Sequence, residues 1–117
     1  MSRTFLVTGA SKGIGLALST RLAAAGHHVV GLARTAPSDF PGTLVPVDLG
    51  YDDAARAALD SIVQRFALDG VVNNVGVVRP AMLADVTLPA LDEVMRVNLH
   101  PSLLAVQAAL PGMRARG

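Results

Sequence analysis

The sequence predicts a doubly wound α/β fold, in which helices cover both faces of a parallel sheet. Two observations lead to this prediction. Short apolar runs rich in Val and Leu alternate along the chain with longer Ala- and Leu-rich stretches of helical periodicity. The junctions between them lack the two-residue turns that join β-hairpins. Strands joined by helical crossovers pair in parallel, so we expect about four strands of an incomplete parallel sheet.

Four apolar runs are predicted as strands. The first is apolar throughout, as expected of a strand that is buried on both faces. Pro46 lies in the third run and favours an edge position, because proline cannot donate a ladder hydrogen bond. The predicted strands are residues 4–8, 29–33, 43–47 and 70–74.

Helices are predicted where apolar residues recur at a spacing of three or four. Ile14, Leu18 and Leu22 follow this spacing in the first helix, and Gly26 provides a stop. The second helix opens with two aspartates, which suit the positive end of the helix dipole. The predicted helices are residues 13–25, 52–66 and 90–113, the last as one or two helices, with loops over 35–42 and 79–89.

Composition excludes several classes of protein. The chain has 117 residues, of which 51% are hydrophobic and 16% charged, and its net charge is +1. This balance excludes a strongly basic nucleic-acid binder. The absence of Cys excludes disulfides, thiolate metal sites and a cysteine nucleophile. No apolar run approaches the roughly 18 residues of a membrane helix, so we expect a cytoplasmic protein without membrane or nucleic-acid partners.

A glycine-rich turn joins the first predicted strand to the first helix. Glycines at 9, 13 and 15 allow the backbone to turn tightly and to approach a phosphate without Cβ clashes. The free N–H groups at the start of the following helix would face that phosphate. The alternative is a tight turn that binds no ligand. The residues predicted here to bind a cofactor are Gly9, Ser11, Lys12, Gly13, Ile14 and Gly15.

Three motifs resemble those of the classical short-chain dehydrogenase/reductase family. The turn has the spacing T-G-x-x-x-G-x-G, Asn73-Asn74-Val75-Gly76 is similar to the family's N-N-A-G, and Asn98 matches its helix asparagine. The resemblance covers essentially the whole chain. It implies a Rossmann-type sheet and makes residues 1–117 the N-terminal portion of a single NAD(P)-binding domain, without a second domain.

The resemblance also implies contacts to the adenosine half of a dinucleotide. Asp48 matches the carboxylate that meets the adenine amino group, with Leu49 beside it, and a carboxylate can accept from that group. The alternative for Asp48 is a helix cap. Asn74 and Gly76 are expected against the adenosine. Thr8 and Asn73 are expected to tie the turn to the fourth strand.

Charge at the end of the second strand favours NADP(H) over NAD(H). NAD sites usually carry an acid there, whereas NADP sites carry an arginine. Here Arg34 follows the strand directly, and no acid comes before Asp39. Arg34 and Lys12 could hold a 2′-phosphate. The alternative is a pair of solvated cations.

The family's reaction needs residues that this sequence does not contain. It transfers hydride between the nicotinamide and a carbonyl or alcohol, with a serine, a Y-x-x-x-K pair and an asparagine that holds a water. Asn98 is the one catalytic residue implied by the resemblance. The single tyrosine, Tyr51, precedes a helix without a lysine partner, and Lys12 is the single lysine. The chain alone is therefore predicted to be inactive.

Other polar residues are given structural roles. We expect His27 and His28 in a solvated turn and His100 at a helix start. The acidic pairs Asp52-Asp53 and Asp92-Glu93 lie in predicted first helical turns, so we predict no metal site and no paired-carboxylate catalysis.

Three functions are compatible with these patterns. The first is the N-terminal half of an NADP(H)-dependent oxidoreductase acting on a small carbonyl or alcohol. The second is a non-catalytic NADP(H)-binding module, and the third an interaction fragment that associates through residues 98–113. The fourth strand would leave an open edge, so we expect a homo-oligomer or pairing with a missing C-terminal half. Residues expected to border the substrate cleft are Val78, Arg79, Pro80 and Met82.

Overall fold

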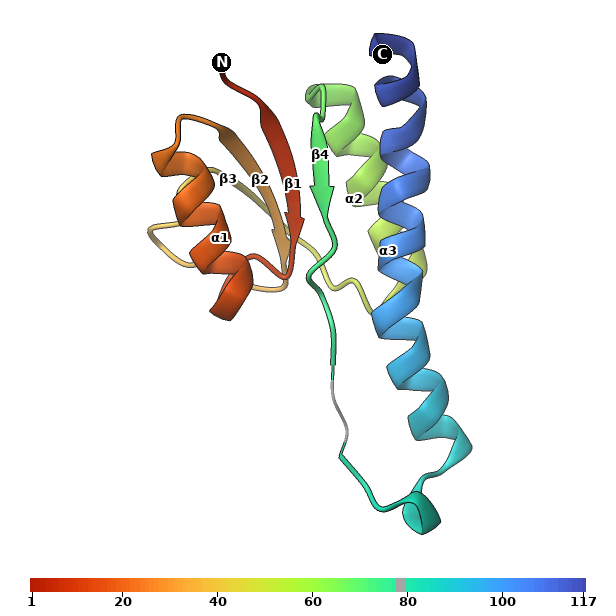
Figure 1. Ribbon diagram of the computed structural model, residues 1–117. Helices are drawn as coiled ribbons and strands as arrows, with labels where there is room; N and C mark the ends of the chain where they lie inside the picture. Colours follow the sequence, from red (N-terminus) through yellow and green to blue (C-terminus); the bar gives the residue numbers. More distant parts are fainter. Residues whose placement is uncertain (78–79) are drawn as a thin grey trace.

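The computed structural model of the chain describes residues 1–77 and 80–117, and it has the predicted alternation of strands and helices (Figure 1). Val78 and Arg79, predicted near the substrate cleft, lie outside the described residues. The elements in chain order are β1 (Thr4–Thr8), α1 (Gly13–Ala24), β2 (His28–Ala33), β3 (Thr43–Pro46), α2 (Asp52–Arg65), β4 (Gly70–Val72), the short 3-10 helix η1 (Leu83–Asp85) and α3 (Leu88–Arg116).

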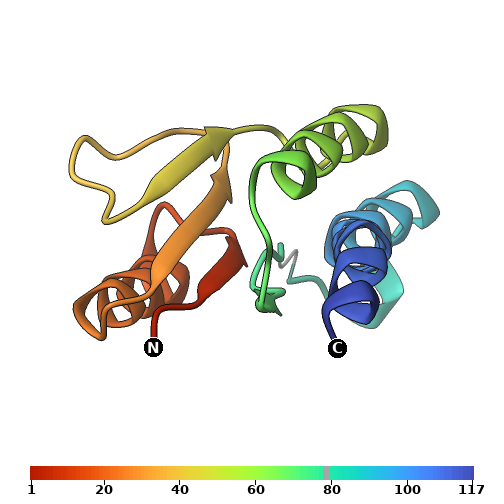
Figure 2. The ribbon, with the colours of Figure 1, turned by 90° about the horizontal axis from the view of Figure 1, so that it is seen from above.

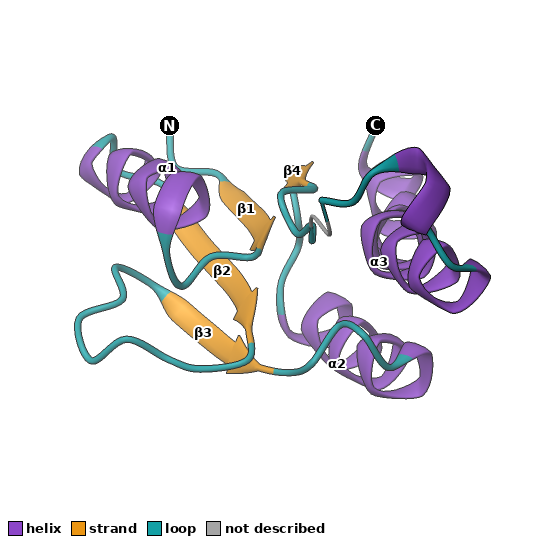
Figure 3. Cartoon of the chain, turned by 90° about the horizontal axis from the view of Figure 1, so that it is seen from below, coloured by secondary structure: helices purple, strands orange, loops and turns teal. Residues whose placement is uncertain are grey.

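The four strands form one parallel sheet with the order β3-β2-β1-β4. The predicted edge position of Pro46 is confirmed, because β3 is an outer strand. β2 and β3 follow one another on one side of β1, whereas β4 pairs with β1 on its other side. Strand order thus reverses beside β1, and the carboxyl ends there are where parallel sheets bind ligands. Figure 3 looks onto this edge of the sheet.

Helices cover both faces of the sheet, as predicted. One cluster of buried residues joins Leu6, Val30 and Leu32 to apolar side chains of α2 and α3. A smaller cluster on the opposite face contains Val7 and Val29, with Leu22 of α1 packed against it. Figure 2 shows α1 on one side of the sheet and α2 and α3 on the other. Leu6 and Val7 are neighbours in β1 and their side chains point to opposite faces, so this strand contributes to both clusters.

The C-terminal region is one helix rather than two. α3 runs for 29 residues and contains Pro101 and Pro111, each of which removes one helical hydrogen bond without ending the helix. Thr87 caps its first turn by accepting from the N–H of Ala90 at 3.3 Å. The predicted loop over 79–89 is therefore wrong at η1 and at the start of α3. Among the described residues, no helix combines the length and apolarity needed to cross a membrane.

The histidines differ from expectation. His27 and His28 are half-buried rather than solvated: Nδ1 of His27 accepts from the N–H of Arg3 at 3.1 Å, and the ring of His28 lies 5.4 Å from that of Phe66. His100 lies within α3, not at its start. The sequence places two histidines at the start of β2, where an apolar ring face can pack against neighbouring strands and helices.

Candidate functional site

The glycine turn after β1 is shaped by backbone constraints that only glycine satisfies. Gly9 and Gly13 have φ values of +63° and +58°, in the left-handed region. A Cβ on Gly15 would lie 2.1 Å from the carbonyl oxygen of Gly9 and 2.7 Å from Nδ2 of Asn74. The start of α1 therefore passes directly against the turn. This close approach requires glycine at position 15.

The first turn of α1 presents bare backbone. Lys12 precedes the helix and provides no side-chain hydrogen bond to its N–H groups. Nothing lies within 4 Å of the position a Cβ on Gly13 would occupy, and the side chain of Ile14 is 78% exposed. Such uncapped N–H groups, together with the helix dipole, form an anion-binding geometry.

Thr8 joins the end of β1 to the segment after β4. Its side chain is buried, and its Oγ1 accepts from the N–H groups of Asn74 at 2.9 Å and Val75 at 3.1 Å. The hydroxyl also donates to the carbonyl of Val72 at 3.4 Å. The structural role predicted for Thr8 is confirmed.

The side chain that reaches back to the turn is Asn74 and not Asn73. Nδ2 of Asn74 donates to the carbonyl oxygen of Gly9 at 3.2 Å, whereas Asn73 is exposed. The prediction that Asn73 makes this tie is therefore wrong. Alternation along the extended backbone explains the exchange, because neighbouring side chains point to opposite faces. Asn74 thus shapes the wall of the turn.

Asn98 is close to Gly76. The side-chain amide of Asn98 accepts from the N–H of Val77 at 2.7 Å and donates to its carbonyl at 3.0 Å. A Cβ on Gly76 would lie 2.9 Å from Oδ1 of Asn98. α3 is thereby fixed to the backbone that follows β4, and Asn98 is positioned at the carboxyl edge of the sheet.

Lys12 and Arg34 lie at the same edge of the sheet. The N–H of Ala10 donates to the carbonyl of Leu32 at 3.2 Å, so the glycine turn runs beside the end of β2. Both cations are exposed. Neither side chain makes a hydrogen bond or ion pair within the described residues, so the guanidinium of Arg34 and the ammonium of Lys12 are available to a ligand.

Asp48 also reaches this edge. The N–H of Val47 donates to the carbonyl of Ala33 at 2.8 Å, which continues the β3–β2 pairing up to Asp48. Oδ1 of Asp48 accepts from the N–H of Gly50 at 2.9 Å, and Leu49 is buried. Asp48 does not cap α2, because the residue preceding the helix is Tyr51 and no side chain caps it. The alternative helix-cap role is therefore wrong.

Sequence reasoning missed two contacts of α3 with this loop. Arg96 donates from its guanidinium to the carbonyl of Gly50, and Nδ1 of His100 lies 3.1 Å from both carboxylate oxygens of Asp52. Arg96 and His100 are four residues apart, so they share one helix face. That spacing was visible in the sequence, but the partners were not, because they lie 46 and 48 residues away.

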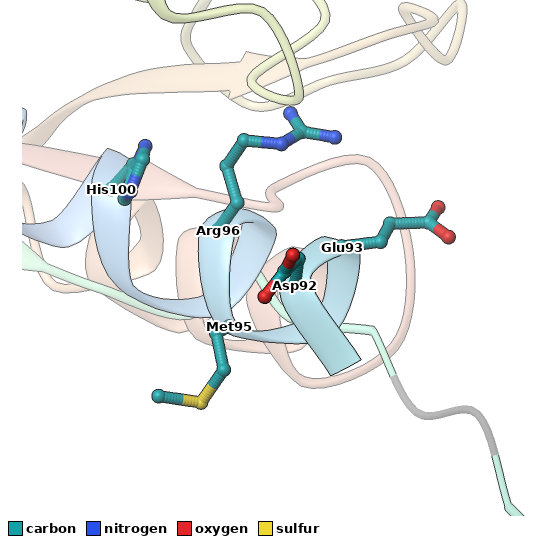
Figure 4. Close-up of a pocket in the computed structure, with 5 residues that line it drawn as sticks. All are labelled: Asp92, Glu93, Met95, Arg96 and His100. Atoms are coloured by element: carbon teal, nitrogen blue, oxygen red, sulfur yellow. The ribbon is translucent and has the colours of Figure 1, made fainter. Parts of the chain in front are cut away.

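A hollow of about 380 Å³ lies beside these two side chains (Figure 4). It is lined by residues of α3 and contains none of the glycines of the turn. The cofactor-binding residues predicted from the sequence lie elsewhere, along the carboxyl ends of the four strands. The lining residues are Asp92, Glu93, Met95, Arg96 and His100.

Comparison with known proteins agrees with this geometry. The family model described as short chain dehydrogenase matches residues 3–117. The chain belongs to this family. It is 39% identical to the L-xylulose reductase of Mesocricetus auratus over 122 residues, which cover 98% of this chain and 49% of that protein. The chain thus spans about half the length of the curated relatives it matches, and the resemblance predicted from the three motifs is confirmed.

Solved structures of the short chain dehydrogenase fold contain both nicotinamide cofactors. A blue fluorescent protein from a metagenomic library, in complex with NADPH, has a TM-score of 0.83 and 29% identity over 95% of this chain and 51% of its own. The NADH-dependent reductase A1-R′, in complex with NAD, has a TM-score of 0.86 and 25% identity over 98% and 53% of the two chains. The Rossmann-type fold class is therefore confirmed.

The residues present fit a dinucleotide. The left-handed Gly9 and Gly13 and the uncapped helix start form an open cradle of backbone, and the close packing of Gly15 against Gly9 and Asn74 holds the helix start beside it. Two unpaired cations and one carboxylate flank that cradle. Tyr51 is 68% exposed at the start of α2, away from Asn98 in sequence and without a lysine partner. This geometry suits the phosphates of a dinucleotide, and the sequence contains no Y-x-x-x-K pair.

Proposed function

We propose that this chain is the cofactor-binding portion of an NADP(H)-dependent oxidoreductase. The observation that carries the proposal is the cradle formed by Gly9, Gly13 and Gly15, because its uncapped N–H groups and lack of Cβ atoms suit a pyrophosphate. Family membership adds support, since its named relatives are dehydrogenases and reductases. In this proposal residues 1–117 are part of one domain.

The adenosine would lie along the carboxyl ends of the strands, between the loop after β3 and the segment after β4. Asp48 would accept from the adenine amino group with the carboxylate oxygen that Gly50 leaves free, and Leu49 would pack beside it. Asn74 and Gly76 would face the ribose. Ser11 would bind a phosphate oxygen through its hydroxyl, because it lies within the glycine turn.

NADP(H) is the proposed cofactor because of the charges at the end of β2. Arg34 would hold the 2′-phosphate through its planar guanidinium, and Lys12 would contribute a second positive charge. Both side chains are exposed and have no partner within the described residues. The first acid after β2 is Asp39, five residues beyond Arg34, so no carboxylate directly follows the strand to bind a ribose 2′-hydroxyl.

When bound, the nicotinamide would supply or accept a hydride. Asn98, whose amide is fixed by Val77, would support a water at the edge of the site. A small carbonyl or alcohol is the proposed substrate class. The chain contributes no Y-x-x-x-K pair, so we expect it to bind the cofactor without turnover, and the acid/base residues to come from additional sequence.

Calorimetric titration of the chain with NADPH and NADH tests this proposal. We expect NADPH to bind more tightly, and Arg34→Asp to reverse the preference by at least about tenfold, since each charged hydrogen bond contributes roughly 1.5–3 kcal/mol. Arg114→Asp is the matched control, because Arg114 is exposed near the end of α3 and changes the net charge equally. An unchanged preference in Arg34→Asp would exclude Arg34 as the phosphate ligand.

A second function, a module that binds NADP(H) without catalysis, is favoured by one observation. The single tyrosine begins α2 and has no lysine four residues later. Extending the coding sequence beyond Gly117 separates the two functions. A following strand with a serine and a Y-x-x-x-K helix, together with NADPH oxidation by a panel of carbonyl compounds, supports the enzyme. A stop codon and no oxidation support the binding module.

Association with further protein is part of the same proposal. α3 leaves a row of apolar side chains exposed by 45–58%, and β4 is an outer strand of the sheet. An exposed row of apolar side chains beside an open strand edge favours a homo-oligomer or a C-terminal half packed against it. Sedimentation of the chain and of Leu99→Asp tests this, with a smaller particle expected for the variant. The residues of the row are Leu91, Met95, Leu99 and Leu103.

A further inference from the structure

One turn of α3 contacts the loop that carries Asp48. Arg96 donates to the carbonyl of Gly50, and His100, one turn later, contacts Asp52 at 3.1 Å. Figure 4 shows the side chains of Arg96 and His100 on one side of the helix and Met95 on the other. α3 therefore holds the loop between β3 and α2 at Gly50, and it contacts the first residue of α2 at Asp52.

The same loop sets the direction of the Asp48 carboxylate. Oδ1 of Asp48 accepts from the N–H of Gly50 at 2.9 Å, and the N–H of Tyr51 donates to the carbonyl of Asp48 at 3.2 Å. Leu49 between them is buried, with 6% of its surface exposed. The peptide groups of Gly50 thus link two side chains: its N–H donates to the carboxylate of Asp48, and its carbonyl accepts from the guanidinium of Arg96. Movement of Gly50 would turn Asp48.

α3 holds the opposite wall of the candidate site as well. Asn98 lies between Arg96 and His100 in sequence, about 200° around the helix from each, and both of its amide atoms bond to Val77. One turn of α3 thus spans the segment after β4 and the loop after β3. These are the two segments expected to face the adenosine.

We propose that Arg96 is a positioning residue that orients Asp48 toward the adenine amino group through Gly50. This inference rests on the proposed function, because it requires a bound adenine dinucleotide. Arginine suits the task, since its guanidinium is permanently charged and donates in a fixed planar geometry. A charged donor also binds a carbonyl more strongly than a neutral one does. Arg96 itself would touch no atom of the cofactor.

The test compares two cofactors that differ at one group. In the hypoxanthine analogue of NADPH a carbonyl oxygen replaces the adenine amino group, so Asp48 loses a donor and faces an acceptor. We expect the wild-type chain to prefer NADPH over this analogue by about tenfold, the value of one good hydrogen bond to a charged group. Asp48→Asn provides the reference, because its amide removes the preference directly.

Arg96→Met is the informative variant. Methionine keeps much of the apolar stem but removes the donor, so the fold is retained while Gly50 is released. We expect the preference for NADPH to fall to about twofold, and Arg96→Lys to restore part of it. Loss of positive charge weakens both anionic cofactors alike, so the ratio isolates the effect on Asp48. Arg114→Met is the matched control on α3 and should leave the ratio unchanged.

Each outcome decides a different claim. If the wild-type chain binds neither cofactor at millimolar concentration, the proposed function fails, and the role of Arg96 with it. If NADPH binds and Asp48→Asn removes the preference while Arg96→Met keeps it, the proposed function stands and the positioning role is overturned. Circular dichroism of Arg96→Met and Arg96→Lys separates a lost fold from a lost orientation, and the Lys variant alone decides if Arg96→Met unfolds.

Discussion

Replacing Thr8 by Val tests the junction on which the candidate site is built. The substitution keeps the shape of the side chain but removes the hydroxyl, which makes three hydrogen bonds. Thr8 is only 1% exposed, so water cannot easily replace these bonds. The N–H groups of Asn74 and Val75 lose their acceptor. At about 1 kcal/mol for each lost bond, with a partial penalty for half-buried donors, we expect the free energy of unfolding to fall by about 2–3 kcal/mol.

Urea unfolding followed by circular dichroism measures this change. The slope of the free energy of unfolding against urea concentration should be the same in the variant and the wild-type chain, because both expose the same surface on unfolding. Thr8→Ser keeps the hydroxyl and should lose less, about 1 kcal/mol for the missing methyl group. Thr20→Val is the matched control: Thr20 is exposed on α1 and, within the described residues, its hydroxyl bonds to the carbonyl of Leu16 alone, so its change should stay within about 0.5 kcal/mol.

The result also bears on ligand binding. Thr8 sets the distance between the glycine turn and the Asn74–Gly76 segment, so Thr8→Val should weaken NADPH binding as well as the fold. If Thr8→Val were as stable as Thr20→Val, the hydroxyl would not join the end of β1 to the segment after β4.

Two further substitutions test the walls of the site. Gly15→Ala would place a Cβ 2.1 Å from a backbone carbonyl oxygen, so we expect NADPH affinity measured by calorimetry to fall by more than about tenfold; unaltered binding would place the cofactor elsewhere. Gly112→Ala, inside α3, is its control: the new Cβ would lie 2.8 Å from Nη1 of Arg116, the end of a flexible side chain that can shift, so NADPH affinity should stay unchanged. Asn98→Ala removes both bonds to Val77 and should lower the free energy of unfolding by about 2 kcal/mol; a loss below about 0.5 kcal/mol would contradict the observed contact.

The sheet could be predicted from sequence because its strands are short, apolar and separated by helices. Pro46 even identified an outer strand, since its lack of an N–H is a local property. The continuity of the C-terminal helix was less predictable. Pro101 and Pro111 argue locally for breaks, but packing of Leu104 and Ala105 into the core keeps α3 continuous.

The glycine turn was predictable for the same reason, because conformations with positive φ depend on the residue itself. The cross-chain contacts were not. Thr8 binds a segment 66 residues away and Arg96 one 46 residues away, and neither partner has a local signature. The choice between Asn73 and Asn74 depended on which side chain faced β1, which follows from where β4 ends. Sequence therefore located the candidate site, while the connections that hold its walls required the structure.

The most direct test of the central claim is a titration of the ¹⁵N-labelled chain with NADPH, followed by NMR of the backbone amides. Binding at the glycine turn predicts saturable shifts for Gly9, Gly13 and Gly15, with further shifts at Asn74 and Gly76. The amides near the C-terminal end of α3 should not move. Shifts confined to α3, or none at millimolar NADPH, would contradict the assignment of this turn as a dinucleotide site.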